Sequence, residues 1–417
     1  MPNKFTIDRR FFLKQSALLA GSLFIPFGLT SANEAKEHFL IQFNIDGGWD
    51  TTLITESWDF STPPDPKKIF IEYSENEILP FGNYFVPPCL LPLKKYFSRM
   101  TLFNGVMMSP LEVGHPSPEL FAKTGTSDGS LPSLTAQFLE SYYDIKTQGI
   151  FASSQLYTAG KYFNKIHSPE ILSLLKYPLN SEPIEENYSI SDLIPIQSPL
   201  EEAKLSLSSK AKALQMCYKK YQIFLDPIED LSIKHLCLGF LSGLYPAANF
   251  TTPSGLDTHS EHPTTHKNLL LKSTEFIAKY VDTLASVPYL NSGESLLDRT
   301  TIIIHSEFTR TPRLNLTRGK DHNPFSNSMI VISPFLKGES IIGKSRIVEE
   351  NLSPIGVPIL VGAPLHRKLE TPLWQSQDTF MVTPTQVYAT LFHAMGMTDK
   401  VAKLYLSSDK ISSVIKS

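Results

Sequence analysis

The sequence has little cysteine, little net charge and no repeats, and each shortage excludes a class of protein. Its 417 residues include three cysteines, in no CxxC or Cys/His spacing, so no cysteine-based zinc site is predicted. The formal net charge is −3, so the chain lacks the basic excess that nucleic-acid partners require. With 41% hydrophobic residues, the chain can still bury a sizeable core.

The N-terminal segment has the order of a cleavable export signal. Residues 8–14, DRRFFLK, place two adjacent arginines before an apolar stretch, and residues 30–32 are small. The paired arginines indicate the twin-arginine route, and we expect residues 1–32 to be removed on transport to the periplasm. A membrane anchor is the alternative, but residues 17–29 fall short of the roughly 20 apolar residues that span a bilayer.

Export by this route has consequences for the mature protein. The twin-arginine translocase carries folded chains, often with a metal or cofactor, so the signal favours a metalloenzyme. After the signal we expect no membrane span, because no later segment is long and apolar enough. An oxidising periplasm permits one disulfide, and the pairing among Cys89, Cys217 and Cys237 stays open.

Strand patterns alternate with helix patterns along the rest of the chain. Strands are predicted at 38–45, 100–107, 300–305 and 328–333, and helices at 132–139, 201–225, 267–287 and 383–396. This alternation predicts an α/β fold, with a mainly parallel central sheet flanked by helices. We expect one domain over residues 38–417, with an insertion around 151–241, where we identify no motif.

Residues of metal-ligating types stand beside the predicted strands. They are Asp46, Asp50, His115, Asp257, His259, Glu307, Asp321 and His322. Mixed carboxylate and imidazole donors suit zinc, manganese or magnesium, which the sequence does not distinguish. Because parallel strands end at one edge of a sheet, we expect these side chains to converge in one pocket there.

Some of these polar residues have a structural interpretation instead. Asp46 and Asp50 follow a strand in a glycine-rich turn, where an aspartate often caps the turn. His305 lies inside a strand and is interpreted as a packing residue. The pair His262 and His266, one helical turn apart, is interpreted as part of a solvated helix face.

In this order, the motifs resemble an uncharacterised family of twin-arginine-exported proteins, placed in the alkaline phosphatase/sulfatase-like superfamily. The likeness rests on LIQFNIDGGWD, GHPSPELFAKTG, LDTHSEH, IIIHSEFTRTPR and GKDHNPFSNSMIVISP. The resemblance implies an alkaline phosphatase-like fold with a two-metal site at the carboxyl edge of the sheet. It implies that Asp46, or else Asp50, is the first metal carboxylate, and that Asp257, His259 and His322 belong to the metal centre.

Two positions depart from the superfamily pattern. His115 stands where the resemblance places a nucleophilic Thr, Ser or Cys, and Ser306-Glu307 stands where it places Asp-His. A histidine can bind a metal, act as a base or attack phosphorus. We expect His115 to act beside the metal, with water activated there, and Ser117, two residues displaced, to contribute little.

Two functions follow from this pattern. The first is an exported metal-dependent hydrolase of a phosphate or sulfate ester, or of a related anionic small molecule or glycan. Arg310 and Arg313 would hold the anion, although solvated loop charges are the alternative. The second function is a non-catalytic binding or assembly protein on the same fold, with the nucleophile lost. The sequence favours the hydrolase and leaves the substrate, the metal and the oligomeric state open.

Overall fold

The computed structural model describes most of the chain after the predicted signal. The described residues are 38–57, 64–81, 84–142, 149–176, 199–253, 255–289, 292–373, 377–397 and 408–416. The predicted signal peptide, residues 1–32, lies outside them. Among the helices of these ranges, none combines the length and the apolar character that crossing a membrane requires.

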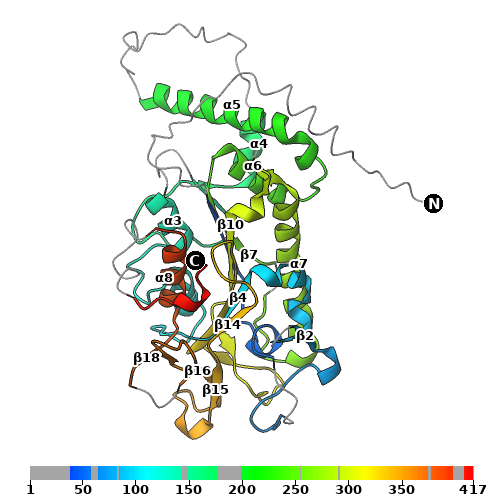
Figure 1. Cartoon of the computed structure of the whole chain (residues 1–417), viewed down its shortest axis with the longest axis vertical. Coiled ribbons are helices and arrows are strands. Elements are labelled where there is room, and N and C mark those ends of the chain that lie inside the picture. Colours follow the sequence, from blue (N-terminus) through cyan, green and yellow to red (C-terminus); the bar gives the residue numbers. More distant parts are fainter. Residues whose placement is uncertain are drawn as a thin grey trace, which may run out of the picture. The chain divides into compact units, whose positions relative to one another are not determined.

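An eight-stranded sheet forms the centre of the fold (Figure 1), in the order β14-β4-β13-β10-β1-β7-β5-β6. Its strands are β1 (Phe39–Asn44), β4 (Met100–Met107), β5 (Ile150–Ala152), β6 (Lys165–Ile166), β7 (Ala247–Thr251), β10 (Thr300–His305), β13 (Ser326–Ile332) and β14 (Ser340–Ile342). Five of the seven neighbouring pairs are parallel, and β13 runs antiparallel to both β10 and β4. The predicted mainly parallel sheet is confirmed.

Helices cover both faces of the sheet. They are α2 (Pro116–Thr124), α3 (Leu134–Tyr142), α4 (Ser168–Leu175), α5 (Pro199–Leu225), α6 (Leu231–Ser242), α7 (His262–Ser286) and α8 (Pro384–Ala394), together with a long 3-10 segment, η3 (Pro88–Arg99). Two-stranded pairs complete the fold: β2 (Leu79–Phe81) with β3 (Tyr84–Val86), β8 (Pro288–Tyr289) with β9 (Glu294–Ser295), β11 (Thr309–Arg310) with β12 (His322–Asn323), β15 (Ser345–Val348) with β16 (Ile359–Gly362), and β17 (Leu365–His366) with β18 (Thr379–Phe380).

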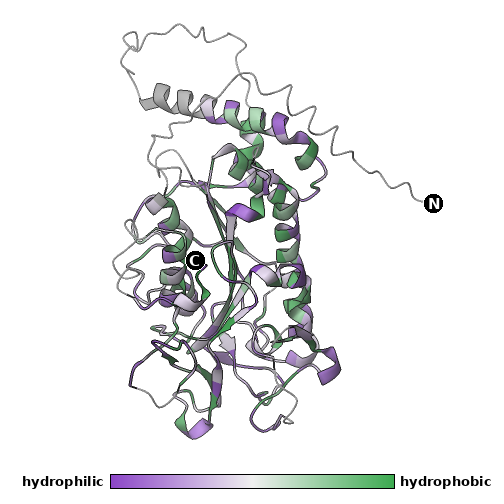
Figure 2. Cartoon of the chain, in the orientation of Figure 1, coloured by the Kyte–Doolittle hydropathy of each residue, from purple (hydrophilic) through white to green (hydrophobic). Residues whose placement is uncertain are grey.

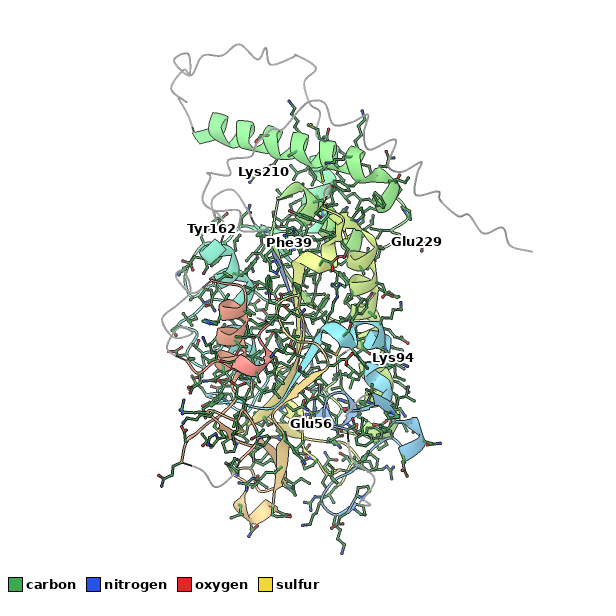
Figure 3. All side chains as sticks on the ribbon, viewed as in Figure 1. Phe39, Glu56, Lys94, Tyr162, Lys210 and Glu229 are labelled. Carbon is green, nitrogen blue, oxygen red and sulfur yellow. The ribbon has the colours of Figure 1, made fainter. Side chains whose placement is uncertain are left out.

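The hydrophobic core has two parts, one on each face of the sheet. Strand β1 contributes side chains to both parts, because successive side chains of a strand point to opposite faces of the sheet. Phe39 and Ile41 pack in the core part that includes α6 and α7, whereas Leu40 packs in the part that includes α3 and α8. Figure 2 shows the hydrophobic colouring of the central strands, and in Figure 3 Phe39 lies inside whereas Lys94 lies at the outside.

Helix α7 begins earlier than the sequence pattern predicts. It starts at His262 and not at residue 267, because Pro263 stands in the first turn, where proline is well accommodated. His262 and His266 therefore lie in the first turns of the helix, and both are fully buried. The interpretation of this pair as a solvated helix face is wrong.

The three cysteines are free in the structure. Cys89 and Cys237 are buried, and Cys217 is partly exposed on α5. Burial raises the pKa of each thiol to about 12. The disulfide that the sequence permits is thus not present.

The strand directions bring five chain segments to one edge of the sheet. Strands β1, β7 and β10 are parallel and end there. Strand β4 ends there too, since β4 and β10 both pair antiparallel with β13, which begins at this edge. The candidate residues consequently follow four strands and precede the fifth.

Candidate metal centre

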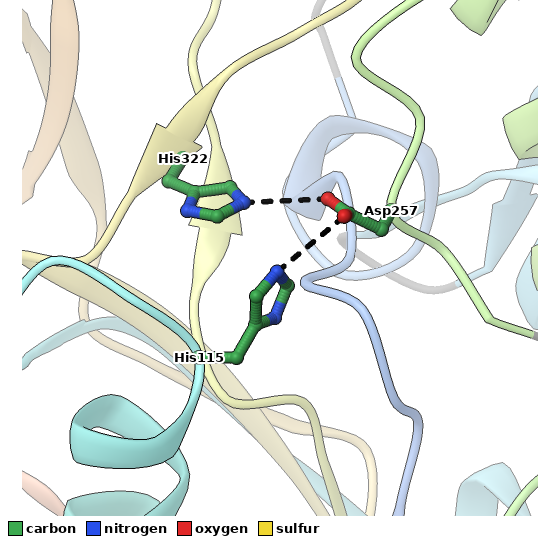
Figure 4. A group of neighbouring side chains, drawn as sticks. All are labelled: His115, Asp257 and His322. Carbon is green, nitrogen blue, oxygen red and sulfur yellow. Dashed lines mark hydrogen bonds and ion pairs between the residues drawn. The ribbon is translucent and has the colours of Figure 1, made fainter.

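Three histidines surround the carboxylate of Asp257 at this edge. The Nε2 atom of His322 lies 3.3 Å from Asp257 Oδ1, and that of His115 lies 3.5 Å from Oδ2 (Figure 4). The Nε2 atom of His259 lies 3.0 Å from Asp257 Oδ1 and 3.0 Å from His322 Nε2. His115, Asp257 and His322 each offer a ligand atom within 4.8 Å of the other two.

The turn that carries Asp257 is held against the end of β1. The backbone N–H of Leu256 donates to the carbonyl of Asp46 at 2.8 Å. The approach is so close that a Cβ on Gly47 would lie 2.3 Å from the Leu256 nitrogen, and Gly47 has φ +98°. Only glycine tolerates both conditions, so the DGG motif serves to seat this turn.

His115 is set by the loop between β4 and α2. It stands at the N-terminal end of α2, which begins with Pro116. The hydroxyl of Ser117 accepts hydrogen bonds from the backbone N–H groups of Leu111 and Glu112, at 2.8 and 3.3 Å. These contacts fix the loop that leads into His115, and they occupy the Ser117 oxygen.

Each of the three imidazoles has an oxygen acceptor at its other nitrogen. His115 Nδ1 lies 2.8 Å from Glu307 Oε1, and His259 Nδ1 lies 3.0 Å from Asp321 Oδ1. His322 Nδ1 lies 3.3 Å from the Val113 carbonyl. A neutral imidazole that donates its Nδ1 proton presents a lone pair at Nε2, so all three rings turn a lone pair toward Asp257.

Glu307 is buried behind His115. Its Oε1 atom also accepts the backbone N–H of Gly47 at 2.8 Å, and its Oε2 accepts the Ser306 hydroxyl at 3.1 Å. Burial alone would raise the pKa of this carboxyl, but the hydrogen bond with His115, the backbone N–H groups of Glu307 and Gly47 and the charge of His115 together outweigh burial and lower it. Glu307 is therefore a charged residue that orients the His115 ring, and the same hydrogen bond raises the pKa of His115.

Arg310 has a different environment from the one expected for a substrate-binding residue. Its side chain is fully buried, and the guanidinium donates to the carbonyls of Gly48 and Lys320, both at 3.0 Å. It also donates to Asp257 Oδ1 at 2.6 Å. Partial burial raises the pKa of Asp257, but the hydrogen bond and charge of Arg310, together with His322 and His259, outweigh burial and lower it to about 2.

These contacts show the surroundings of both arginines. Arg310 has its donors engaged by the protein, so it braces the site and keeps Asp257 ionised. Arg313 lies 3.1 Å from Glu350 Oε2 in a partly exposed ion pair. The contacts of Arg310 give it a structural role, and anion binding by either arginine stays a prediction.

The two aspartates after β1 are not equivalent. Asp50 is buried and belongs to a separate cluster with Lys320 and His262, at 2.5 and 3.1 Å from its Oδ2. Asp46 is exposed beside Glu307, and its pKa is raised by partial burial and by the charge of Glu307. Among the described residues, neither completes the group of ligand atoms around Asp257.

The donor set fits a divalent metal. Ligands at about 2.1 Å from a tetrahedral zinc stand about 3.4 Å apart, close to the 3.3 and 3.5 Å that separate Asp257 from His322 and His115. Acceptors on the outer nitrogens of the rings are the usual second shell of metal-binding histidines. In their neutral forms the three rings offer Nε2 donors beside a carboxylate, and burial with the nearby Arg310 lowers the pKa of His322, which disfavours a proton there.

Most of the residues that the sequence predicts for this site lie close together, but the sequence did not indicate which of them stand behind the others. Asp257, His259 and His322 meet with His115, while Glu307 and Asp321 stand directly behind the rings that they orient. His305 packs in the sheet as expected, with its Nε2 3.0 Å from Gln42 Nε2. The cluster of Asp50, His262, His266 and Lys320 was not predicted, although the spacing of its two histidines places them on one helix face.

The sequence matches one family model over part of its length. Residues 248–360 match a family model described as "Protein of unknown function (DUF1501)". No curated protein matches the sequence.

Several solved structures are similar to this chain at low identity and low TM-score. A putative sulfatase from Bacteroides thetaiotaomicron is 11% identical, with 88% of this chain and 72% of that chain covered and a TM-score of 0.32. The zinc complex of the C-terminal periplasmic domain of EcEptC from Escherichia coli is 9% identical, covers 72% and 74%, and has a TM-score of 0.33. The lipoteichoic acid synthase LtaP from Listeria monocytogenes is 9% identical, covers 84% and 75%, and has a TM-score of 0.35. Since fold does not imply function, activity has to be argued from the residues of the site.

Proposed function

We propose that this protein is an exported metal-dependent hydrolase that cleaves a phosphate or sulfate ester, or a related anionic substrate. The observation that carries the proposal is the convergence of three imidazole Nε2 atoms on the Asp257 carboxylate. Each ring is oriented by an acceptor behind it, which is the arrangement of a prepared cation site.

His115, Asp257 and His322 would hold the cation, with His259 as a further donor. When bound, a divalent metal supplies a Lewis acid that polarises the ester oxygen and lowers the pKa of a bound water. The protein keeps this donor set ready: Glu307 holds the His115 ring, and Arg310 keeps Asp257 ionised at 2.6 Å. Zinc, manganese and magnesium all remain candidates.

We propose direct attack by water and no covalent intermediate. Ser117, the hydroxyl nearest to His115 in the sequence, accepts two backbone N–H groups of its own loop. It is therefore engaged in shaping the loop. His115 itself has its Nδ1 on Glu307 and its Nε2 toward Asp257, which suits a metal ligand better than a nucleophile.

The substrate is proposed to be a soluble anionic ester or a glycan ester, met in the periplasm after twin-arginine export. The site supports a substrate that approaches from solvent, because the side chains of Asp257 and His259 are 49% and 46% exposed. The donors of Arg310 are engaged by the protein, so we propose that the cation makes the principal contact with the negative charge.

The experiment that tests this function compares wild type, His115→Ala and Ser117→Ala. Metal content after purification is measured by mass spectrometry, and turnover is measured on a panel of phosphate and sulfate esters. We expect metal and activity in wild type, loss of both in His115→Ala, and little change in Ser117→Ala. A wild type that binds no divalent metal and turns over no ester favours the non-catalytic binding protein. Loss of activity in Ser117→Ala alone assigns the nucleophile to the serine.

A further inference from the structure

A second polar cluster is buried beside the metal centre, and the proposed reaction does not use it. It consists of Asp50, Thr258, His262, His266 and Lys320, all buried. Thr258 lies at its middle, with its hydroxyl 2.8 Å from His266 Nδ1 and 2.9 Å from His262 Nδ1.

The proton on each atom of this cluster can be assigned from one backbone group. The Asp50 N–H donates to His266 Nε2 at 3.0 Å, so this nitrogen carries no proton and His266, if neutral, carries its proton on Nδ1. His266 then donates to the Thr258 hydroxyl, whose own proton we assign to His262 Nδ1 at 2.9 Å, the nearer acceptor, and not to the Leu256 carbonyl at 3.3 Å. The remaining His262 proton is on Nε2, 3.1 Å from Asp50 Oδ2.

The hydrogen bonds therefore form a closed ring that starts and ends on Asp50. Both histidines in the ring are neutral, in agreement with burial, which lowers the pKa of His262 to about 4 and that of His266 well below its ordinary value. The ring has one net negative charge, on Asp50, and Lys320 Nζ neutralises it at 2.5 Å. A buried polar network in which each member is satisfied is rigid.

The ring is joined to the metal centre through the backbone on both sides. Thr258 is the residue between Asp257 and His259, so its side chain fixes the turn that presents both. Lys320 stands two residues before His322, and its backbone N–H donates to the Thr258 carbonyl at 3.2 Å. Lys320 Nζ also donates to the Phe70 carbonyl at 2.9 Å, which anchors the far end of the side chain.

We infer that Thr258, His262, His266 and Asp50 are positioning residues, whose hydrogen-bond ring sets the geometry of Asp257, His259 and His322 for the cation. This inference rests on the proposed metal site and adds the device that organises it. Each of the four acts through the ligand-bearing turn or the segment that carries Lys320.

Thr258 offers a sharp test, because valine has the shape of threonine without its hydroxyl. Thr258→Val removes the acceptor of His266 and the donor of His262 together. Thr258→Ser keeps the hydroxyl and loses only a methyl group. The matched control is Thr301→Val, since Thr301 is also fully buried, has its hydroxyl 2.9 Å from that of Ser333, and lies near the opposite end of β10 from the site.

Cobalt(II) is the probe, since its visible absorption reports the coordination geometry and its titration gives an affinity. We expect about 10- to 100-fold weaker cobalt binding and an altered spectrum in Thr258→Val. Thr258→Ser should restore both, and Thr301→Val should bind cobalt as wild type does. Urea unfolding of all four proteins shows whether the two valine variants lose comparable stability.

A second readout needs no metal. In protein labelled with ¹⁵N-histidine, with the imidazole signals assigned to their residues, the ring predicts that His266 is protonated at Nδ1 and His262 at Nε2. Both signals should change in Thr258→Val and remain in Thr258→Ser.

The outcomes separate this inference from the proposed function. Wild type that binds no cobalt overturns the metal site itself. Wild-type binding with an unchanged affinity and spectrum in a folded Thr258→Val overturns the positioning ring alone. If Thr258→Val does not fold, the tautomers of His262 and His266 in wild type still test the inference. Two imidazoles protonated at the same nitrogen would contradict the assigned hydrogen-bond ring.

Discussion

His115 and Glu307 are 192 residues apart in the sequence, and His115 Nδ1 lies 2.8 Å from Glu307 Oε1. Because Glu307 holds Nδ1, the orientation of the His115 ring is fixed and its Nε2 atom points toward Asp257. The pair joins the end of β4 to the end of β10, two strands that are not neighbours in the sheet but are separated by β13. The candidate centre thus depends on the sheet to bring its parts together.

Glu307→Gln should weaken the centre without removing any residue around Asp257. The amide can still accept the Gly47 N–H, but it loses the charge that holds the His115 ring. We expect metal affinity or turnover to fall about 10- to 100-fold, as for other outer-shell carboxylates. Calorimetric titration with zinc and manganese measures the affinity, and an affinity equal to that of wild type would contradict the orienting role.

Asp257→Asn should have a larger effect, because this carboxylate is common to all three histidines. We expect loss of measurable metal binding, together with a stability cost of about 1.5–3 kcal/mol, since the buried Arg310 loses its charged partner. Metal analysis measures the loss of binding, and urea unfolding measures the loss of stability. Glu140→Gln is the control, because Glu140 pairs with Lys161 at 2.7 Å in a largely exposed ion pair and should change neither.

The Asp50–Lys320 ion pair should show strong coupling in a double-mutant cycle. Both side chains are almost completely buried, so Lys320→Met alone leaves an uncompensated charge and should cost about 3–5 kcal/mol. The double variant Asp50→Asn/Lys320→Met should recover part of this loss. The same cycle on Lys68 and Glu349, a half-exposed pair at 2.9 Å, should give about 0–1 kcal/mol. Equal coupling in the two cycles would refute the buried pair as a stabilising contact.

Glu72 should make stability fall as pH rises. Its side chain is 7% exposed, its Oε2 has no hydrogen-bond partner among the described residues, and it faces His262, Asp50 and Lys320. Burial, with the charge of Asp50, raises the pKa of Glu72 to about 8 in the folded state, above the value of 4.5 that an ordinary glutamate has.

The sign of this effect follows from proton counting. Between pH 4.5 and 8 the unfolded chain releases the Glu72 proton while the folded chain keeps it, so the contribution of this residue to stability is greatest below 4.5 and declines by at most about 1.4 kcal/mol per pH unit. Relative to wild type, Glu72→Gln should become progressively more stable from pH 5 to 8. Urea unfolding at four pH values tests this, and a difference that does not grow with pH would reject the raised pKa.

Export should depend on the two adjacent arginines of the N-terminal motif. Changing Arg9 and Arg10 both to lysine keeps the charge but removes the pair that the translocase reads. We expect the precursor to stay in the cytoplasm, as seen by fractionation and blotting. Lys4→Arg, outside the motif, should mature normally, and normal maturation of the double variant would count against the twin-arginine route.

The sequence predicted the fold where local patterns are strong. Strands β4 and β10 occur at the residues that the apolar runs indicate, 100–107 and 300–305. The meeting of His115, Asp257 and His322 also follows from the pattern, since parallel strands end at one edge. The role of Arg310 did not follow, because two of its partners are the backbone carbonyls of Gly48 and Lys320, and every residue type has a backbone carbonyl.

The same limit applies to the buried cluster. His262 and His266 have the spacing of one helix face, which equally suits a solvated surface. What decides is the position of Pro263 and the closeness of Asp50, 212 residues from His262. Contacts between residues so far apart in the sequence depend on how α7 packs against the end of β1. The local spacing of residues does not specify that packing.

The direction of the hydrogen-bond ring has a consequence for how the site can change by mutation. Its polarity is set by the main-chain amide of Asp50, and every amino acid except proline supplies that amide. Substitutions at Thr258 or either histidine can break the ring, but none of them can reverse it. The direction of the proton arrangement beside the candidate metal centre thus comes from the course of the backbone, whereas closure of the ring needs the Asp50 carboxylate that accepts the His262 proton.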